Sequence, residues 1–158
     1  MYSYFVDQEK HKYILPSYKK IIIDRKSKRT WFCFLPPLVF DHKIILKRFL
    51  PKKGNIVLFC SSSIPVYPDP NEMTNFLDKL YYDAKKELIK FKKKKHNINI
   101  LSVSLPNVLG FRLAKEANAK KMISVVPGAN LSDSIYESLV TWRQREDAAK
   151  KGFYHDDF

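Results

Sequence analysis

The chain has 158 residues, of which 45% are hydrophobic and 14% aromatic, a composition that suits one folded domain and excludes intrinsic disorder. The net charge is +13, and 23 of the 29 basic residues are lysines. Sites that recognise base edges or bind phosphate with two hydrogen bonds favour arginine instead. We therefore expect a solvated, lysine-rich surface, with a nucleic-acid-binding face as the alternative.

The first third of the chain is predicted to be rich in strands. A strand at 21–24 that begins with three isoleucines, a polar turn at 25–28 and an apolar run at 30–35 predict an antiparallel hairpin. Residues 41–50 fit a short helix, because they place Ile44, Ile45, Leu46 and Phe49 among lysine and arginine. The continuous apolar run 55–60 predicts a strand that is covered on both faces.

The clearest predicted helix follows a loop rich in serine and proline. Asp69 is placed to cap its N-terminus, Pro70 suits the first turn, and Glu72 completes a spacing like that of a capping box. Apolar residues then recur at steps of three and four as far as about Lys92, which gives the helix one buried face. The lysines at 92–95 suit the negative end of the helix dipole.

The rest of the chain continues as alternating strands and helices. We expect a strand at 97–102, a helix at 107–118, a strand at 121–126 and a helix at 132–150. Strands that alternate with helices form right-handed crossovers and a parallel sheet. The predicted fold is therefore a three-layer α/β fold, with a mostly parallel sheet, helices on both faces and an N-terminal antiparallel hairpin.

We expect a single α/β domain over residues 1–158. Residues 1–16 form an N-terminal arm, and residues 17–130 form the core of the fold. Residues 131–158 form a helix and a polar tail, at the point where a lid region would begin. The chain is thus expected to have one hydrophobic core.

Several absences in the sequence narrow the function. No apolar run approaches the length of about 18 residues that a membrane span needs, and residues 1–10 lack the apolar segment of a signal peptide. The four glycines form neither a dinucleotide fingerprint nor a Walker loop, and the histidines lack metal-ligand spacing. Cys33 and Cys60 lie in apolar runs and are expected to be buried thiols. We expect a cytoplasmic protein with no membrane span, cofactor or metal.

Residues 100–107 pass directly from a predicted strand into a predicted helix, without a loop. Such a sharp turn exposes its apex side chain above the sheet, where a helix N-terminus directs unpaired N–H groups. Ligands of open α/β sheets bind at this edge, beyond the carboxyl ends of the strands. Ser104 at the apex therefore meets the requirements of an acyl-transfer nucleophile. A serine here also suits an N-cap, a role that Asn107 would fill if Ser104 were free.

The segment Ser102-Val103-Ser104-Leu105-Pro106 resembles the nucleophile elbow of the α/β-hydrolase fold family. The family pattern is small-x-Ser-x-small, most often with glycine at both ends; here Ser102 takes the first small position and Pro106 departs from the second. The order of elements over residues 17–140 is similar to the first part of that fold. The resemblance implies a serine hydrolase or acyltransferase that acts on a small ester or thioester substrate.

The resemblance also implies the two donors of an oxyanion hole. The backbone N–H of Leu105, directly after the nucleophile Ser104, is the first. The second is expected in the loop after the strand 30–35, where Pro36 and Pro37 have no N–H. Leu38 therefore supplies the first available N–H of that loop.

The acid and base of this family follow the nucleophile in the order Asp or Glu, then His. Asp133 and His155 occur in that order and are the candidates. Their other interpretations are a residue at a helix N-terminus and a member of the polar tail. In the family, these groups normally follow later strands than this chain is expected to have.

Two explanations of the short chain stay open. It is either a fragment of a longer hydrolase, including a truncated reading frame, or a short relative that has lost its triad and is kept for binding. A further function class is a basic nucleic-acid-associated domain, which would use residues 92–95 with Lys85, Lys86 and Lys90.

Overall fold

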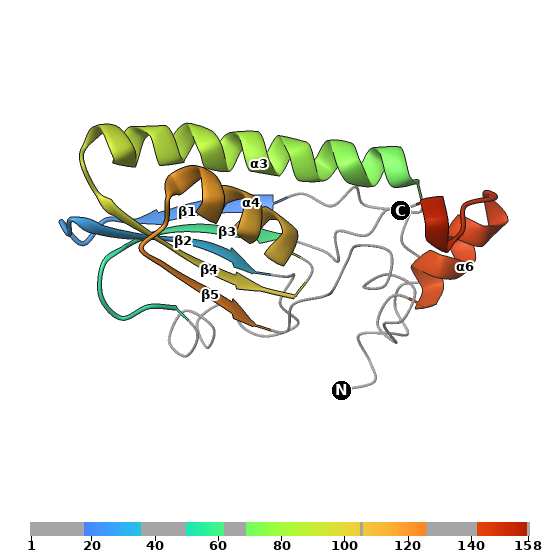
Figure 1. Ribbon diagram of the computed structural model, residues 1–158. Coiled ribbons are helices and arrows are strands. Elements are labelled where there is room, and N and C mark those ends of the chain that lie inside the picture. The colour runs from blue at the N-terminus through green and yellow to red at the C-terminus, as the bar shows by residue number, and fades with distance from the viewer. Residues whose placement is uncertain (1–17, 36–49, 62–68, 105, 126–141, 158) are drawn as a thin grey trace.

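The computed structural model describes residues 18–35, 50–61, 69–104, 106–125 and 142–157. Its five-stranded sheet has the order β1-β3-β2-β4-β5 (Figure 1). The strands are β1 (Tyr18–Ile23), β2 (Arg29–Leu35), β3 (Asn55–Ser61), β4 (Asn97–Val103) and β5 (Lys121–Val125). The helices are α3 (Pro70–Lys93), α4 (Asn107–Ala117), α6 (Trp142–Lys150) and the 3₁₀ helix η3 (His155–Asp157). The predicted α/β class is confirmed.

The sheet is mixed, with β1 as its single antiparallel strand among those described. β3, β2, β4 and β5 run parallel to one another, and β1 pairs antiparallel with β3. The predicted hairpin between the first two strands is therefore wrong, because β3 lies between β1 and β2.

The side chain of Asn55 gives a physical reason for this pairing. Its Oδ1 accepts hydrogen bonds from the backbone N–H groups of Arg25 and Ser27, and its Nδ2 donates to the carbonyl of Ser27. These bonds fix the turn after β1 to the first residue of β3. β1 and β2 therefore lie on opposite sides of that strand. A short polar turn between two apolar runs predicts a hairpin. Here the turn is instead bonded to a residue 30 positions away, and the two strands do not pair.

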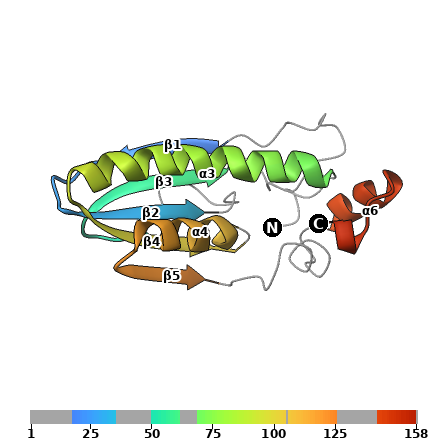
Figure 2. The same ribbon diagram turned by 45° about the horizontal axis from the view of Figure 1, so that its top comes forward.

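Helices α3 and α4 pack on the same face of the sheet (Figures 1 and 2). Their apolar sides and one face of the central strands form a core that contains Phe32, Phe34, Val57, Phe59, Met73, Leu80, Leu88, Ile100, Leu109 and Leu113. The opposite face has its own buried cluster of Trp31, Cys33, Leu35, Leu50, Ile56, Leu58, Cys60 and Leu101. Both faces of β3 are buried, as predicted for 55–60.

The helix predicted at 41–50 lies outside the described residues, apart from Leu50. Helices on the second face of the sheet therefore stay a prediction. The helix predicted at 132–150 is described from Trp142 onward, where α6 begins.

Helix α3 begins where the sequence predicts. Asp69 is its N-cap, with Oδ1 accepting from the backbone N–H of Asn71 at 2.8 Å. Its last turn carries Lys90, Lys92 and Lys93 at the negative end of the helix dipole. In the part of the chain that the structure describes, no helix combines the length and the apolar character that crossing a membrane requires.

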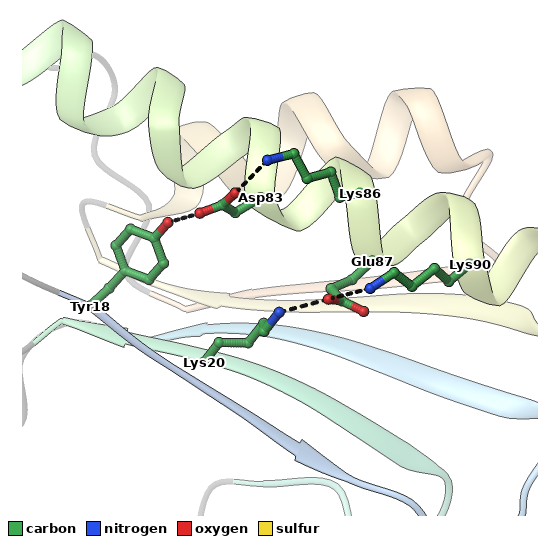
Figure 3. Close-up of polar contacts among 6 residues, drawn as sticks. All are labelled: Tyr18, Lys20, Asp83, Lys86, Glu87 and Lys90. Carbon is green, nitrogen blue, oxygen red and sulfur yellow. Dashed lines mark hydrogen bonds and ion pairs between the residues drawn. The ribbon is translucent and has the colours of Figure 1, made fainter.

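Two polar clusters connect the edge strand β1 to α3 (Figure 3). The Tyr18 hydroxyl donates to Asp83, which also pairs with Lys86 at 3.1 Å. Two residues along β1, Lys20 reaches the buried carboxylate of Glu87 at 2.7 Å, and Lys90 reaches the same oxygen at 3.0 Å.

Glu87 is the central group of the second cluster. Burial by itself would raise the pKa of its carboxyl, but hydrogen bonds and attraction from Lys20 and Lys90 outweigh burial and lower that pKa below its usual value. The ionised form of Glu87 therefore stabilises the packing of β1 on α3.

We predict that Glu87→Gln lowers stability at neutral pH by about 1.5 kcal/mol, because Lys20 and Lys90 both lose their carboxylate partner. The pKa of Glu87 is lower in the folded chain, so its contribution is complete above about pH 4.5 and is lost as the pH falls through the folded value. In urea titrations at decreasing pH from pH 7, the free energy of unfolding should fall less for Glu87→Gln than for wild type. Glu146→Gln, at an exposed site on α6, is the control; equal acid losses for Glu87→Gln and wild type would contradict the prediction.

Candidate functional site

Ser104 lies in the short turn between β4 and α4, as the sequence predicts. β4 ends at Val103 and α4 begins at Asn107. Ser104 has a φ of 60°, in the left-handed region that a residue with a Cβ rarely adopts. Such a conformation costs about 1–3 kcal/mol and persists only where the surrounding structure enforces it.

Positive φ angles also occur at three other described non-glycine residues, Lys26, Lys95 and Asn118. These lie in connections that precede β2, β4 and β5, and Asn118 is the C-cap of α4. Among the four, Ser104 is the one at the carboxyl edge of the parallel strands. Its conformation therefore coincides with the edge at which α/β sheets bind ligands.

Ser104 also lies at the point where the strand order reverses. β2 and β4 are parallel neighbours, with Phe34 opposite Ser102. The next strand after β2 in the chain is β3, on one side, whereas the next strand after β4 is β5, on the other. Connections that diverge in this way leave a crevice between the two strand ends, and ligands of open α/β sheets bind there.

The buried amide of Asn107 holds the turn at Ser104. Its Nδ2 donates to the carbonyl of Ser104 at 2.7 Å and to that of Val125 at 3.1 Å, and its Oδ1 accepts from the Ser124 hydroxyl at 2.6 Å. The backbone N–H of Asn107 donates to the same Ser104 carbonyl, and the N–H of Ser104 donates to Val125. One side chain thus joins the turn to the end of β5.

The expected N-caps of α4 are not observed. The cap position belongs to Pro106, and no side chain hydrogen-bonds there as a cap. The interpretation of Asn107 as the cap is therefore wrong, because its amide is used across the turn. Half-buried Ser104 does not cap the helix either, because no side-chain cap hydrogen bond is made there.

Helix α4 approaches β4 very closely at one point. A Cβ on Gly110 would lie 2.6 Å from Cβ of Ser102 and 2.8 Å from its Oγ. Ser102 is fully buried, and its hydroxyl has no partner among the described residues. The close approach at this point therefore requires a glycine at position 110 of the helix. A glycine in the middle of a predicted helix was the sequence signal for this contact.

The other predicted site residues are not brought to Ser104 by described contacts. Leu38, Leu105 and Asp133 lie outside the described residues. His155 begins η3, and its Nδ1 lies 3.0 Å from Oδ1 of the adjacent Asp156. The roles of these four residues stay predictions.

Other reactive groups in the described part of the chain do not offer a competing centre. Cys33 and Cys60 are buried, as predicted, and burial raises the pKa of the Cys33 thiol to about 12. A thiol with that pKa is not a nucleophile near neutral pH. No group of three or more potential metal ligands occurs among the described residues. The Ser104 turn is therefore the candidate site.

No protein-family model matches the chain, and neither the curated proteins nor the solved structures yield a match.

We predict that Asn107→Ala destabilises the protein by about 2–4 kcal/mol, because the Ser124 hydroxyl and the Val125 carbonyl lose a buried partner. Ser124→Ala, which removes one of these bonds, should cost about 1 kcal/mol. Thermal or urea unfolding measures both. Equal, small losses for the two variants would show that Asn107 does not hold the turn.

We also predict that Gly110→Ala destabilises the protein by about 1–3 kcal/mol, although alanine favours helices, because the added methyl group overlaps Ser102. Ser102→Gly in the same chain should recover most of the loss, since it removes the atoms that the methyl group meets. A double-mutant cycle in urea measures the coupling. Additive effects of the two substitutions would contradict the close contact.

Proposed function

We propose that the protein is a serine-dependent hydrolase or acyltransferase for small esters or thioesters, with Ser104 as nucleophile. The observation that carries the proposal is the positive φ of Ser104 between β4 and α4, at the divergence of β2 and β4. A strained turn at that position presents a hydroxyl to a bound ligand and places it at the start of a helix.

The proposed reaction is an acyl transfer in two steps. Ser104 Oγ attacks the carbonyl carbon of the substrate, its proton passes to a base, and the leaving alcohol or thiol departs with a proton. Water, or an acceptor alcohol in the case of a transferase, then attacks the acyl-serine ester and releases Ser104. The oxyanion of each intermediate needs two N–H donors, for which Leu105 and Leu38 are proposed.

The arrangement of the strands supports the second donor. The loop that contains Leu38 leaves the end of β2, and β2 is the direct neighbour of β4. A donor in that loop therefore starts from the strand beside the nucleophile, as an oxyanion hole requires. His155 is proposed as the base and Asp133 as the acid, on their order in the sequence.

A fluorophosphonate probe tests the nucleophile directly, because it reacts covalently with activated serines. We predict that wild type is labelled with one equivalent and that Ser104→Ala is not labelled. Ser102→Ala is the matched control: it removes a buried hydroxyl that has no described partner, two residues away, and should label like wild type. Intact mass and peptide mapping identify the modified residue.

Labelling that persists in Ser104→Ala would contradict the assignment of Ser104 as the nucleophile. Wild type that folds but does not react would favour the alternative of a hydrolase-like protein kept for binding.

A further inference from the structure

Four connections at the amino ends of the parallel strands are strongly basic. They precede β2, β3, β4 and β5, and they lie together at the end of the sheet where these strands begin (Figure 1). Ser104 follows β4 and is therefore at the other end. We name their residues 24–29, 52–54, 92–96 and 118–121 the basic end. It holds twelve of the 29 lysines and arginines: Arg25, Lys26, Lys28, Arg29, Lys52, Lys53, Lys92, Lys93, Lys94, Lys95, Lys120 and Lys121. Its one acidic residue is Asp24.

Described contacts join three of these connections, and a further contact reaches the helix that leads into the fourth. Arg25 donates to the carbonyls of Pro51 and Gly54 at 2.8 and 3.2 Å, which joins the first connection to the second. The Lys28 ammonium lies 3.4 Å from the Lys94 carbonyl, which joins the first to the third. Lys92 reaches the carbonyl of Glu116 at 3.3 Å, beside the end of α4.

The lysines of the basic end differ from three lysines of α3 in their pairing with carboxylates. Lys85, Lys86 and Lys90 pair with Glu116, Asp83 and Glu87, so each has a carboxylate within 3.1 Å. None of the twelve residues of the basic end pairs with a carboxylate of the described residues at salt-bridge distance. The nucleic-acid-binding surface that uses residues 92–95 with Lys85, Lys86 and Lys90 stays a prediction. The unpaired charges beside 92–95 are those of the other three connections.

The surface charge affects a titratable group beneath it. His96 is half-buried and its Nδ1 lies 2.8 Å from the Thr30 hydroxyl. Burial, and then the charges of Lys28 and Lys94, lower the pKa of its imidazole, although Asp24 acts in the opposite direction. After burial, two lysines of the basic end thus contribute to this shift.

The side chains of the basic end favour phosphate contacts over base stacking or membrane insertion. The exposed large hydrophobic residues of the described chain are Ile22, Tyr82, Ile89, Val108, Phe111, Val125 and Tyr154. None of them lies within the four segments, so the basic end lacks the aromatic platforms that bind single strands and the apolar side chains that enter lipid. Lysines act as point charges and suit the evenly spaced phosphates of a duplex.

We propose that the basic end binds double-stranded nucleic acid through its phosphate backbone, without sequence preference. This function is independent of acyl transfer, because the surface lies at the amino ends of the parallel strands, whereas Ser104 follows the carboxyl end of β4. The duplex would lie across the four connections, in contact with lysines from several of them.

Fluorescence anisotropy with short DNA and RNA duplexes tests the proposal between about 50 and 200 mM salt. The first variant combines Lys52→Gln, Lys53→Gln, Lys94→Gln and Lys95→Gln. The control combines Lys79→Gln, Lys86→Gln, Lys150→Gln and Lys151→Gln, exposed sites outside the basic end, and loses the same net charge.

We expect the first variant to lose affinity at least about tenfold, and its slope of log affinity against log salt to fall by about 0.9 for each phosphate contact removed. The control should stay within about threefold of wild type, and Ser104→Ala should bind like wild type. Circular dichroism confirms that each variant is folded.

Equal losses in the two quadruple variants would overturn the proposal, because net charge and not the basic end would then set the affinity. Single strands that bind as tightly as duplexes would also overturn it. So would binding to vesicles of acidic phospholipid that depends on the basic end while duplexes do not bind.

Discussion

Helix α4 lies so close to strand β4 that Gly110 has no room for a side chain above Ser102. Two residues, Leu105 and Pro106, separate Ser104 from the first residue of the helix, and Ser104 itself has a positive φ. The strain is balanced by Asn107, whose amide joins the turn to β5. Removing either the close packing or the amide would relax the turn and move the hydroxyl. The proposed chemistry therefore depends on how tightly one helix packs on one strand.

The two proposed functions use opposite ends of the same sheet. The carboxyl ends of the strands carry Ser104 where the connections of β2 and β4 diverge. The amino ends carry the basic residues, because each of four connections contributes lysine or arginine. A parallel sheet separates these two sets of connections by the length of its strands. One end can therefore be altered without changing the geometry of the other.

Much of the fold was predictable, because local patterns determine local elements. The cap at Asp69, the apolar steps of α3 and the doubly buried β3 were all visible in the sequence. The partner of β1 was not, because three isoleucines predict a strand but do not select its neighbour. That choice depends on Asn55, a residue 30 positions beyond the turn that it holds. Strand order follows from such distant contacts, and no periodic pattern of apolar residues in the sequence predicts them.

The candidate site likewise has features that the sequence predicts and features that only the tertiary structure reveals. The sequence by itself determined that a serine follows a strand and precedes a helix, since residue order fixes that much. Only the tertiary structure decided that Ser104 has a positive φ, that Asn107 holds the turn and that the lysines of four connections gather at one end. The physical reason is that these features join residues far apart in the chain, and only the packing of strands and helices brings them together.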